Sequence, residues 1–128
     1  MNLDATSLHN TQGTLEARLK SKTIQFRTVL DTLPDYVFIK DVNGVYLACN
    51  KACEAYFGDK EHNIVGKTDY DLVDREIADS FIAKDNQAME MGRSVTSEEW
   101  LTLKSSGKTI LSETTKTPMY DDNGQLIG

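Results

Sequence analysis

The chain is poor in the residues that mark several classes of protein. It has 2 cysteines, 2 prolines and 2 histidines, and no run of roughly 18 apolar residues that could span a bilayer. The N-terminus has neither a basic start nor an apolar stretch, so we expect no signal peptide. So few cysteines give no disulfide framework, which predicts a reducing, cytoplasmic compartment. A parent protein could still be membrane-associated outside this segment.

Basic charge is scarce as well. The formal net charge is −6, whereas binding to nucleic acid requires a basic surface. We therefore expect no nucleic-acid partner. Hydrophobic residues make up 39% and charged residues 27%, which is typical of a folded protein. The length of 128 residues fits one domain.

An amphipathic helix is predicted near the N-terminus, after a loose tail over residues 1–13. Thr14 is the expected N-cap, and Pro34 ends the helix because proline disfavours helical geometry in the residue before it. The apolar residues follow the a/d spacing of a coiled coil, with Lys22 in one apolar slot. They are Leu15, Leu19, Phe26, Val29 and Leu33. This stripe either packs on its own domain or also pairs with a second copy in a dimer.

Short aromatic and β-branched runs predict strands at both ends of the remaining chain. They cover residues 36–40, 45–49, 95–103 and 109–119, and residues 125–128 open a fifth strand. The first two flank an Asn-Gly turn, which is a strong hairpin signal.

The residues between the hairpins predict helices. A short helix over 51–57 follows Asn50 as its N-cap, and a long helix runs from Asp74 to about Met91, with Gly92 as its stop. Its buried stripe is expected to use Ile77, Phe81, Ala88 and Met91.

Because strands and helices are segregated, the fold class is α+β. We expect a five-stranded antiparallel sheet with helices on one face, its last strand truncated. In the third strand, Trp100 and Thr102 alternate with Leu101 and Leu103, so both faces of the sheet need cover. The N-terminal amphipathic helix is the candidate for the second face.

The order and spacing of these elements resemble the PAS family over residues 24–128, with residues 1–23 as a tail and the start of the helix. The pieces that carry the resemblance are Phe26–Pro34, Lys40–Tyr46, Asn50–Ala52, Val65–Thr68 and Pro118–Gly124. The resemblance implies a sensory domain of a bacterial signal-transduction protein, either a sensor histidine kinase of a two-component system or a diguanylate cyclase with a GGDEF domain. It also implies that the fifth strand continues beyond Gly128 toward an output domain.

No cofactor is predicted. Flavin-binding members of the family carry a reactive cysteine where this chain reads Gly66–Asp69, and haem-binding members use a histidine on the long helix, which here has none. Asp69, Asp71 and Asp74 could hold a hard cation, but we favour helix caps and expect no metal site. His9 and His62 belong to no catalytic motif, so we expect no enzyme activity in this fragment.

The resemblance places a ligand pocket between sheet and helices. Its walls are expected to include Phe38, Lys40, Trp100, Thr102, Ser112 and Thr114. A buried Lys40 would need a partner such as Glu98 or a ligand carboxylate. We favour instead a Lys40 that reaches the rim and a Trp100 that fills the core.

Two interpretations of the cysteines are possible. Cys49 and Cys53 could form a redox pair or half a metal site, but two small buried hydrophobic residues are favoured.

The sequence therefore predicts a sensory domain that binds an unidentified small molecule or dimerises to control an output domain. A homodimer is expected through Leu15, Leu19 and Phe26. The alternative is a ligand-free protein-interaction domain with a filled core.

Overall fold

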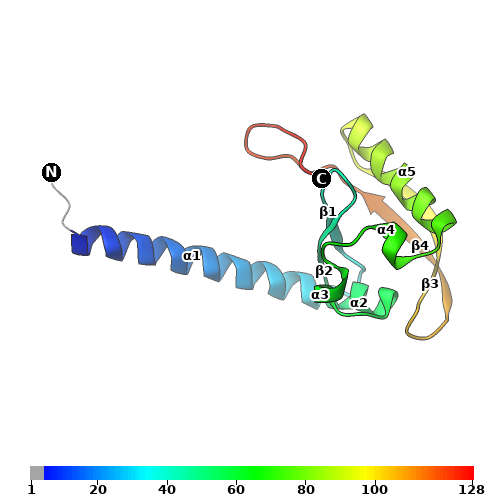
Figure 1. The fold of residues 1–128 in the computed structure, drawn as a ribbon, viewed down its shortest axis with the longest axis horizontal. Helices are drawn as coiled ribbons and strands as arrows, with labels where there is room; N and C mark the ends of the chain where they lie inside the picture. The colour runs from blue at the N-terminus through cyan, green and yellow to red at the C-terminus, as the bar shows by residue number, and fades with distance from the viewer. Residues whose placement is uncertain (1–4) are drawn as a thin grey trace.

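The computed structural model describes residues 5–128, with side chains from residue 13 onward, and contains a long helix attached to a small α+β body (Figure 1). Along the chain, one hairpin comes before a series of helices and a second hairpin comes after it. The elements are α1 (Ala5–Thr32), β1 (Phe38–Lys40), β2 (Tyr46–Cys49), α2 (Lys51–Phe57), α3 (Glu61–Ile64), α4 (Asp69–Leu72), α5 (Arg75–Met91), β3 (Val95–Thr102) and β4 (Thr109–Lys116). The predicted α+β class and antiparallel strands are confirmed.

Both hairpins form where the sequence predicts them. In the first, the Asp41 carboxylate accepts hydrogen bonds from the backbone amides of Asn43 and Val45, and Gly44 takes the positive φ of 80° that the turn needs. The register of β1 on β2 shifts between Ile39 and Lys40. The second hairpin pairs β3 with β4 without interruption, from Val95 opposite Lys116 to Thr102 opposite Thr109.

The two hairpins lie in separate sheets, unlike the single five-stranded sheet we expected. In the part of the chain that the structure describes, β1 pairs only with β2 and β3 only with β4. Residues 125–128 pair antiparallel with residues 119–121 across the turn at 121–124, as the opening of the predicted fifth strand would, and Tyr120 with Leu126 forms the one bridge of this pairing. Met119 donates its amide to the Gly128 carbonyl and accepts one from Ile127.

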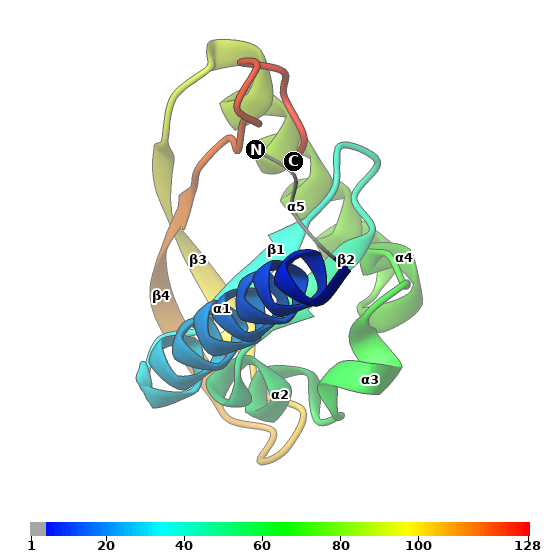
Figure 2. The same ribbon diagram turned by 90° about the vertical axis from the view of Figure 1, so that its left-hand side faces the viewer.

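The N-terminal helix differs most from expectation. Residues 5–13, predicted to be loose, continue the helix through Gly13, so Thr14 is not its N-cap; residues 1–4 lie outside the described part. The end before Pro34 is confirmed. The helix projects away from the body in Figure 1, and Figure 2 views it from near its free end.

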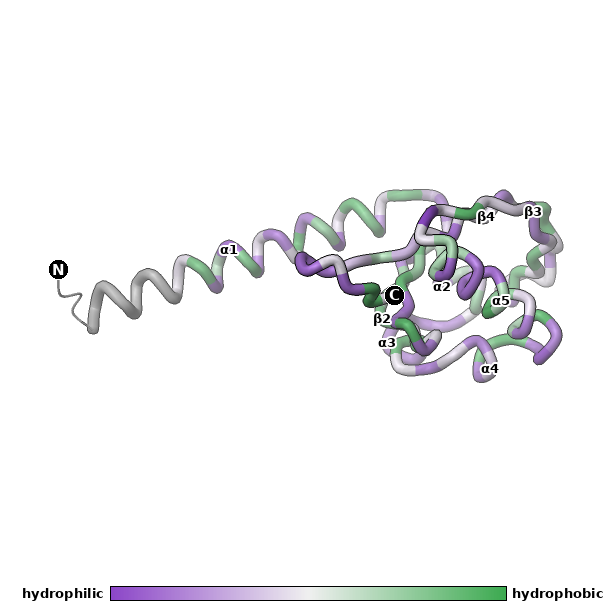
Figure 3. Tube along the Cα trace, turned by 90° about the horizontal axis from the view of Figure 1, so that it is seen from above, coloured by the Kyte–Doolittle hydropathy of each residue, from purple (hydrophilic) through white to green (hydrophobic). Residues whose placement is uncertain are grey.

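The predicted packing of α1 across the sheet is therefore wrong. Only its last turns contact the body, through buried Leu30 and through Arg27 and Asp31. Leu15, Leu19, Phe26 and Val29 remain exposed. Figure 3 shows hydrophobic and hydrophilic positions alternating along this uncovered helix. Among the side chains of residues 13–128, none covers the apolar stripe of α1 or the outer face of β3 and β4.

The core lies between the hairpins and the short helices. It contains Tyr46, Cys49, Cys53, Tyr56, Phe57, Ile64, Leu72, Phe81 and Leu101. Helix α5 starts after Asp74 and stops at Gly92, as predicted. It buries Ala78, Phe81 and Ala88, whereas Ile77 and Met91 are exposed, contrary to the prediction. The buried face is one residue out of phase at its start because Ala78, and not Ile77, faces the body.

Asn50 joins the first hairpin to the helices on either side. Its fully buried side chain donates to the carbonyls of Leu30 and Asp35 and accepts from the amides of Val37 and Cys53. An asparagine amide has two donor hydrogens and two acceptor lone pairs. All four are used, so this residue caps α2 and also fixes the end of α1 against the entry to β1.

We predict that Asn50→Ala lowers the free energy of unfolding by about 3 kcal/mol, because it leaves buried backbone groups without partners. Urea unfolding followed by circular dichroism measures this. Asn63→Ala is the matched control, since the Asn63 side chain is exposed and donates to the exposed end of the Asp59 side chain. Equal losses for the two variants would contradict the role of Asn50.

Candidate functional site

Five buried or half-buried side chains form a continuous ion-pair network that connects both hairpins to two helices. The Tyr46 hydroxyl of β2 donates to Asp69 Oδ1 at the start of α4, at 2.6 Å. Lys40 Nζ of β1 lies 2.5 Å from Asp69 Oδ2 and 2.7 Å from Asp85 Oδ2 of α5. Asp85 Oδ1 lies 2.9 Å from Lys116 Nζ of β4. The two lysines and two aspartates balance in charge, which is the condition for keeping such groups in the interior.

We favoured a Lys40 that reaches the rim of the pocket, and the structure shows otherwise. Lys40 is buried, and its expected partner Glu98 points outward on β3. The partners are Asp69 and Asp85, which lie far from it in sequence and which no local pattern connects to it. The requirement for a counter-charge was predicted correctly, but its identity was not.

The three aspartates predicted as caps or cation ligands have separate roles. Asp71 forms a capping box with Thr68, and Asp74 precedes α5. Asp69 is fully buried and belongs to the ion-pair network. Among residues 13–128 no cluster of three His, Cys, Asp or Glu side chains is arranged to hold a metal ion.

Aromatic rings surround the two ammonium groups. Lys116 Nζ lies 4.6 Å from the centre of the Phe38 ring and 5.3 Å from that of Phe81. Lys40 Nζ lies 5.3 Å from the Phe38 ring and 4.9 Å from that of Tyr46. Contacts of this kind attract a cation to a ring face, more strongly away from water. The Phe38 ring therefore interacts with the ammonium groups of both lysines.

Titration of the buried hydroxyl and thiols is suppressed. Burial, followed by the charge of Asp69, raises the pKa of Tyr46 far above its ordinary value, so the hydroxyl stays neutral and donates. Burial raises the pKa of Cys49 to about 11, and burial together with Cys49 raises the pKa of Cys53 further. Both thiols are free and buried. Protonated buried thiols are poor nucleophiles, which supports their interpretation as small hydrophobic residues.

A cavity of about 480 Å³ lies between the inner face of β3 and β4 and helix α2; we call it the inner cavity. Six aromatic rings line it: Tyr36, Phe38, Tyr46, Tyr56, Phe57 and Phe81. Its polar side chains include Glu99, Ser112, Thr114 and Lys116. Aromatic rings beside hydroxyl and charged groups can hold a small organic molecule that has both apolar and polar parts.

Of the six predicted pocket residues, three line the inner cavity, two do not line it, and Lys40 lines a second cavity described below. Phe38, Ser112 and Thr114 line the inner cavity. Trp100 and Thr102 do not: Trp100 is 71% exposed, and both lie on the outer face of β3. Trp100 therefore does not fill the core. Since apolar side chains occur on both faces of this strand, its alternation left the phase undecided, and a shift of one residue reverses every side chain.

Several site residues were missed. Glu99 is buried on the inner face and paired with Lys84 Nζ at 2.6 Å. Asp85 lies on the buried face of α5, four residues after Phe81 and three before Ala88, so helical spacing contained the signal. No comparable signal marked Lys116.

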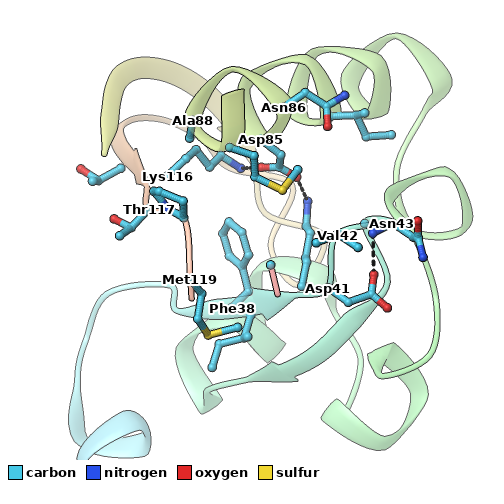
Figure 4. Close-up of a pocket in the computed structure, with 18 of the residues that line it drawn as sticks. Phe38, Asp41, Val42, Asn43, Asp85, Asn86, Ala88, Lys116, Thr117 and Met119 are labelled. Atoms are coloured by element: carbon cyan, nitrogen blue, oxygen red, sulfur yellow. Dashed lines mark hydrogen bonds and ion pairs between the residues drawn. The ribbon is translucent and has the colours of Figure 1, made fainter. Parts of the chain in front are cut away.

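A second cavity, also of about 480 Å³, opens between β1 and β4; we call it the β1–β4 cavity. Lys40, Asp85 and Lys116 line it together with Met89 and Met119. Figure 4 shows Lys116 and Asp85 facing each other above the Phe38 ring. Phe38 and Lys116 line both cavities, so they form the partition between them.

We predict that Asp69→Asn lowers the free energy of unfolding by about 3 kcal/mol, because Lys40 loses one of its two buried counter-charges. Asp122→Asn, a change of the same kind in an exposed turn, is the control and is expected to change it by less than about 0.5 kcal/mol. Urea unfolding of both variants checks this. An Asp69→Asn variant as stable as the control would mean that the network does not hold the elements together.

Known proteins share this fold and parts of this sequence. A family described as the PAS fold matches residues 30–128. A diguanylate cyclase of Vibrio cholerae is 33% identical over 101 residues, covering 78% of this chain and 32% of that protein. The aerobic respiration control sensor protein ArcB of Escherichia coli K12 is 31% identical over 102 residues, covering 80% of this chain and 13% of ArcB. The chain thus spans a minor part of each relative.

A solved structure has the same arrangement. VqmA of Vibrio cholerae, in a complex described as containing ligand and DNA, superposes with a TM-score of 0.73 at 26% identity, over 82% of this chain and 47% of VqmA. The family match covers well over half of the chain, and the resemblance found in the sequence is confirmed. This chain belongs to the PAS-fold family.

Proposed function

We propose that this chain is the sensory module of a longer signalling protein, and that it binds a small molecule with apolar and polar parts in the inner cavity. The observation that carries this proposal is the cavity itself: about 480 Å³, walled by aromatic rings and offering Ser112, Thr114, Glu99 and Lys116 as polar contacts. The related sequences are parts of a diguanylate cyclase and of a sensor protein, which supports a role in signal transduction.

The ion-pair network offers a route by which such a ligand could act. Lys116 and Phe38 line the inner cavity, and Lys116 is paired with Asp85, which also holds Lys40. A ligand that draws Lys116 toward itself weakens one link between β4 and α5. A bound molecule shifts a conformational equilibrium only by its difference in affinity for the two states, and this contact supplies such a difference.

In this proposal the chemistry belongs to an output domain, a histidine kinase or diguanylate cyclase, elsewhere in the longer protein. The fragment itself recognises and does not catalyse. The buried free thiols Cys49 and Cys53 are compatible with a reducing, cytoplasmic setting. Within residues 5–128, none of the helices combines the length and the apolar character needed to cross a bilayer.

We predict that Thr114→Leu abolishes binding of small molecules in the inner cavity, since Thr114 lines it and leucine adds bulk there. The same change at Thr102, on the outer face of the sheet, is the matched control and leaves binding intact. The measurement is ligand-observed NMR of the protein against a library of small heteroaromatic and hydroxylated compounds. Hits that bind both variants equally would place the binding site elsewhere, and a library without hits would favour the ligand-free alternative.

The second proposed role is self-association through α1. The exposed apolar residues Leu15, Leu19 and Phe26 lie on one side of the helix and have no partner in the body. A contiguous apolar stripe of this kind marks an interaction surface. A homodimer would cover it.

We predict that Leu19→Glu combined with Phe26→Glu shifts the protein from dimer to monomer, because both carboxylates lie on the apolar stripe. Ile24→Glu is the control: Ile24 is equally exposed, but helical geometry puts it on the opposite side. Sedimentation velocity measures the mass. A double variant that stays dimeric would show that this side of α1 is not the contact.

A further inference from the structure

We propose that the inner cavity selects an uncharged aromatic molecule that carries an N–H or O–H group, and that Glu99 selects it by accepting a hydrogen bond from that group. This inference rests on the proposed function and names the chemical class of the ligand. Three features of the cavity lead to it: the bonding of Glu99, the balance of buried charge and the aromatic walls.

Glu99 has one carboxylate oxygen that the described part of the chain leaves without a donor. Its side chain is only 4% exposed, and it lines the inner cavity. Oε1 accepts a hydrogen bond from Lys84 Nζ at 2.6 Å, whereas no group among residues 13–128 donates to Oε2. Every side-chain oxygen or nitrogen that these residues enclose completely has a partner, so Oε2 keeps accessible surface. Because Glu99 lies on the inner face of β3, that surface faces the cavity.

This oxygen sets a requirement for any molecule that covers it. A carboxylate oxygen accepts hydrogen bonds and cannot donate them. A ligand with a donor at this point replaces the water that Oε2 loses, and a hydrogen bond to a charged acceptor is stronger than one between neutral groups. A ligand without a donor leaves Oε2 desolvated and unpaired, which lowers its affinity by about tenfold or more.

The charges that face the inside of the cavity are already neutralised within the protein. Glu99 pairs with Lys84, and Lys116 pairs with Asp85 at 2.9 Å. A cation would have to compete with Lys84, and an anion with Asp85, after giving up its own hydration. An uncharged ligand pays no such cost. The remaining charged residues of the wall are exposed to water: Asp35 and Glu113.

The walls favour a flat ring. The rings of Tyr36 and Tyr56 stack with their centres 5.8 Å apart, and both line the cavity. Burial raises the pKa of Tyr56 to about 12, so its hydroxyl adds no charge to the site. Aromatic walls pack against the faces and edges of an aromatic ligand.

A first pair of probes tests the donor. Indole is uncharged and has one N–H group, and N-methylindole has the same ring without a donor. We expect the unmodified chain to bind indole at least about tenfold more tightly than N-methylindole. Ligand-observed NMR titration measures both dissociation constants.

Two variants separate the donor from the size of the methyl group. In Glu99→Gln the preference for indole is expected to fall to about twofold or less, because the charged acceptor is lost. Glu98→Gln, the same change at the neighbouring exposed position on the outer face, is the control and keeps the full preference. A preference that persists in Glu99→Gln would come from the size of the methyl group and would overturn the role of Glu99.

A second set of probes tests the charge. Tryptophol is uncharged, tryptamine is a cation at neutral pH and indole-3-acetate is an anion, and the three have side chains of similar length. We expect tryptophol to bind the unmodified chain at least about tenfold more tightly than either ion.

Lys84→Met gives a readout that a merely structural role of the ion pair would not move. It leaves Glu99 without its counter-charge, so this variant is expected to bind tryptamine about tenfold more tightly than the unmodified chain does. Lys67→Met, at an exposed position, is the control and leaves tryptamine binding unchanged. A Lys84→Met variant with unchanged affinity for tryptamine contradicts the charge balance proposed for the cavity.

The outcomes distinguish this inference from the proposed function. If the five compounds bind alike and Thr114→Leu abolishes their binding, the inner cavity is a ligand site without this selectivity: the proposed function stands and the inference falls. Binding that survives Thr114→Leu places the compounds outside the cavity and also overturns the inference. If none of the five binds, the inference fails, and the compound library described above decides the proposed function separately.

Discussion

The buried ion pairs of Lys40 and Lys116 with Asp69 and Asp85 are the constraint on which the arrangement of this domain depends. They connect elements that share no backbone ladder: β1 belongs to one sheet, β4 to the other, and α4 and α5 lie between them in sequence. Hydrogen bonding within each hairpin is local and cannot orient one hairpin against the other. In the described residues these opposite charges bridge that gap, and their desolvation makes any other arrangement costly.

The same network borders both cavities, so the residues that line them also hold the strands against α5. Phe38, held between two ammonium groups, separates the inner cavity from the β1–β4 cavity, and Lys116 faces both. A molecule that contacts these residues therefore acts on the groups that hold α5 against the strands. In the proposed function, occupancy of the inner cavity changes the position of the helices through these contacts.

The surfaces of the domain show what the fold leaves unsatisfied. Helix α1 bears an apolar stripe interrupted by Lys22, and the outer sheet face bears Trp100 beside two opposed glutamates. Neither pattern stabilises an isolated chain. Exposed apolar stripes of this kind mark interaction surfaces, and the proposed self-association through α1 rests on that.

Local patterns in the sequence determined the hairpins, the boundaries of α2 and α5, the α+β class and the need of Lys40 for a counter-charge. These depend on neighbours within a few residues: Asn-Gly at the turn, Asn50 as a cap, Gly58 and Gly92 at positive φ. Only the tertiary structure decided which charges meet and which face of β3 points inward. Asp85 and Lys116 come from separate elements. Leu101 and Glu99 face the core, where Lys84 of α5 pairs with Glu99, and Trp100 faces outward. Alternation along a strand defines two faces, but the elements packed against it select the buried one.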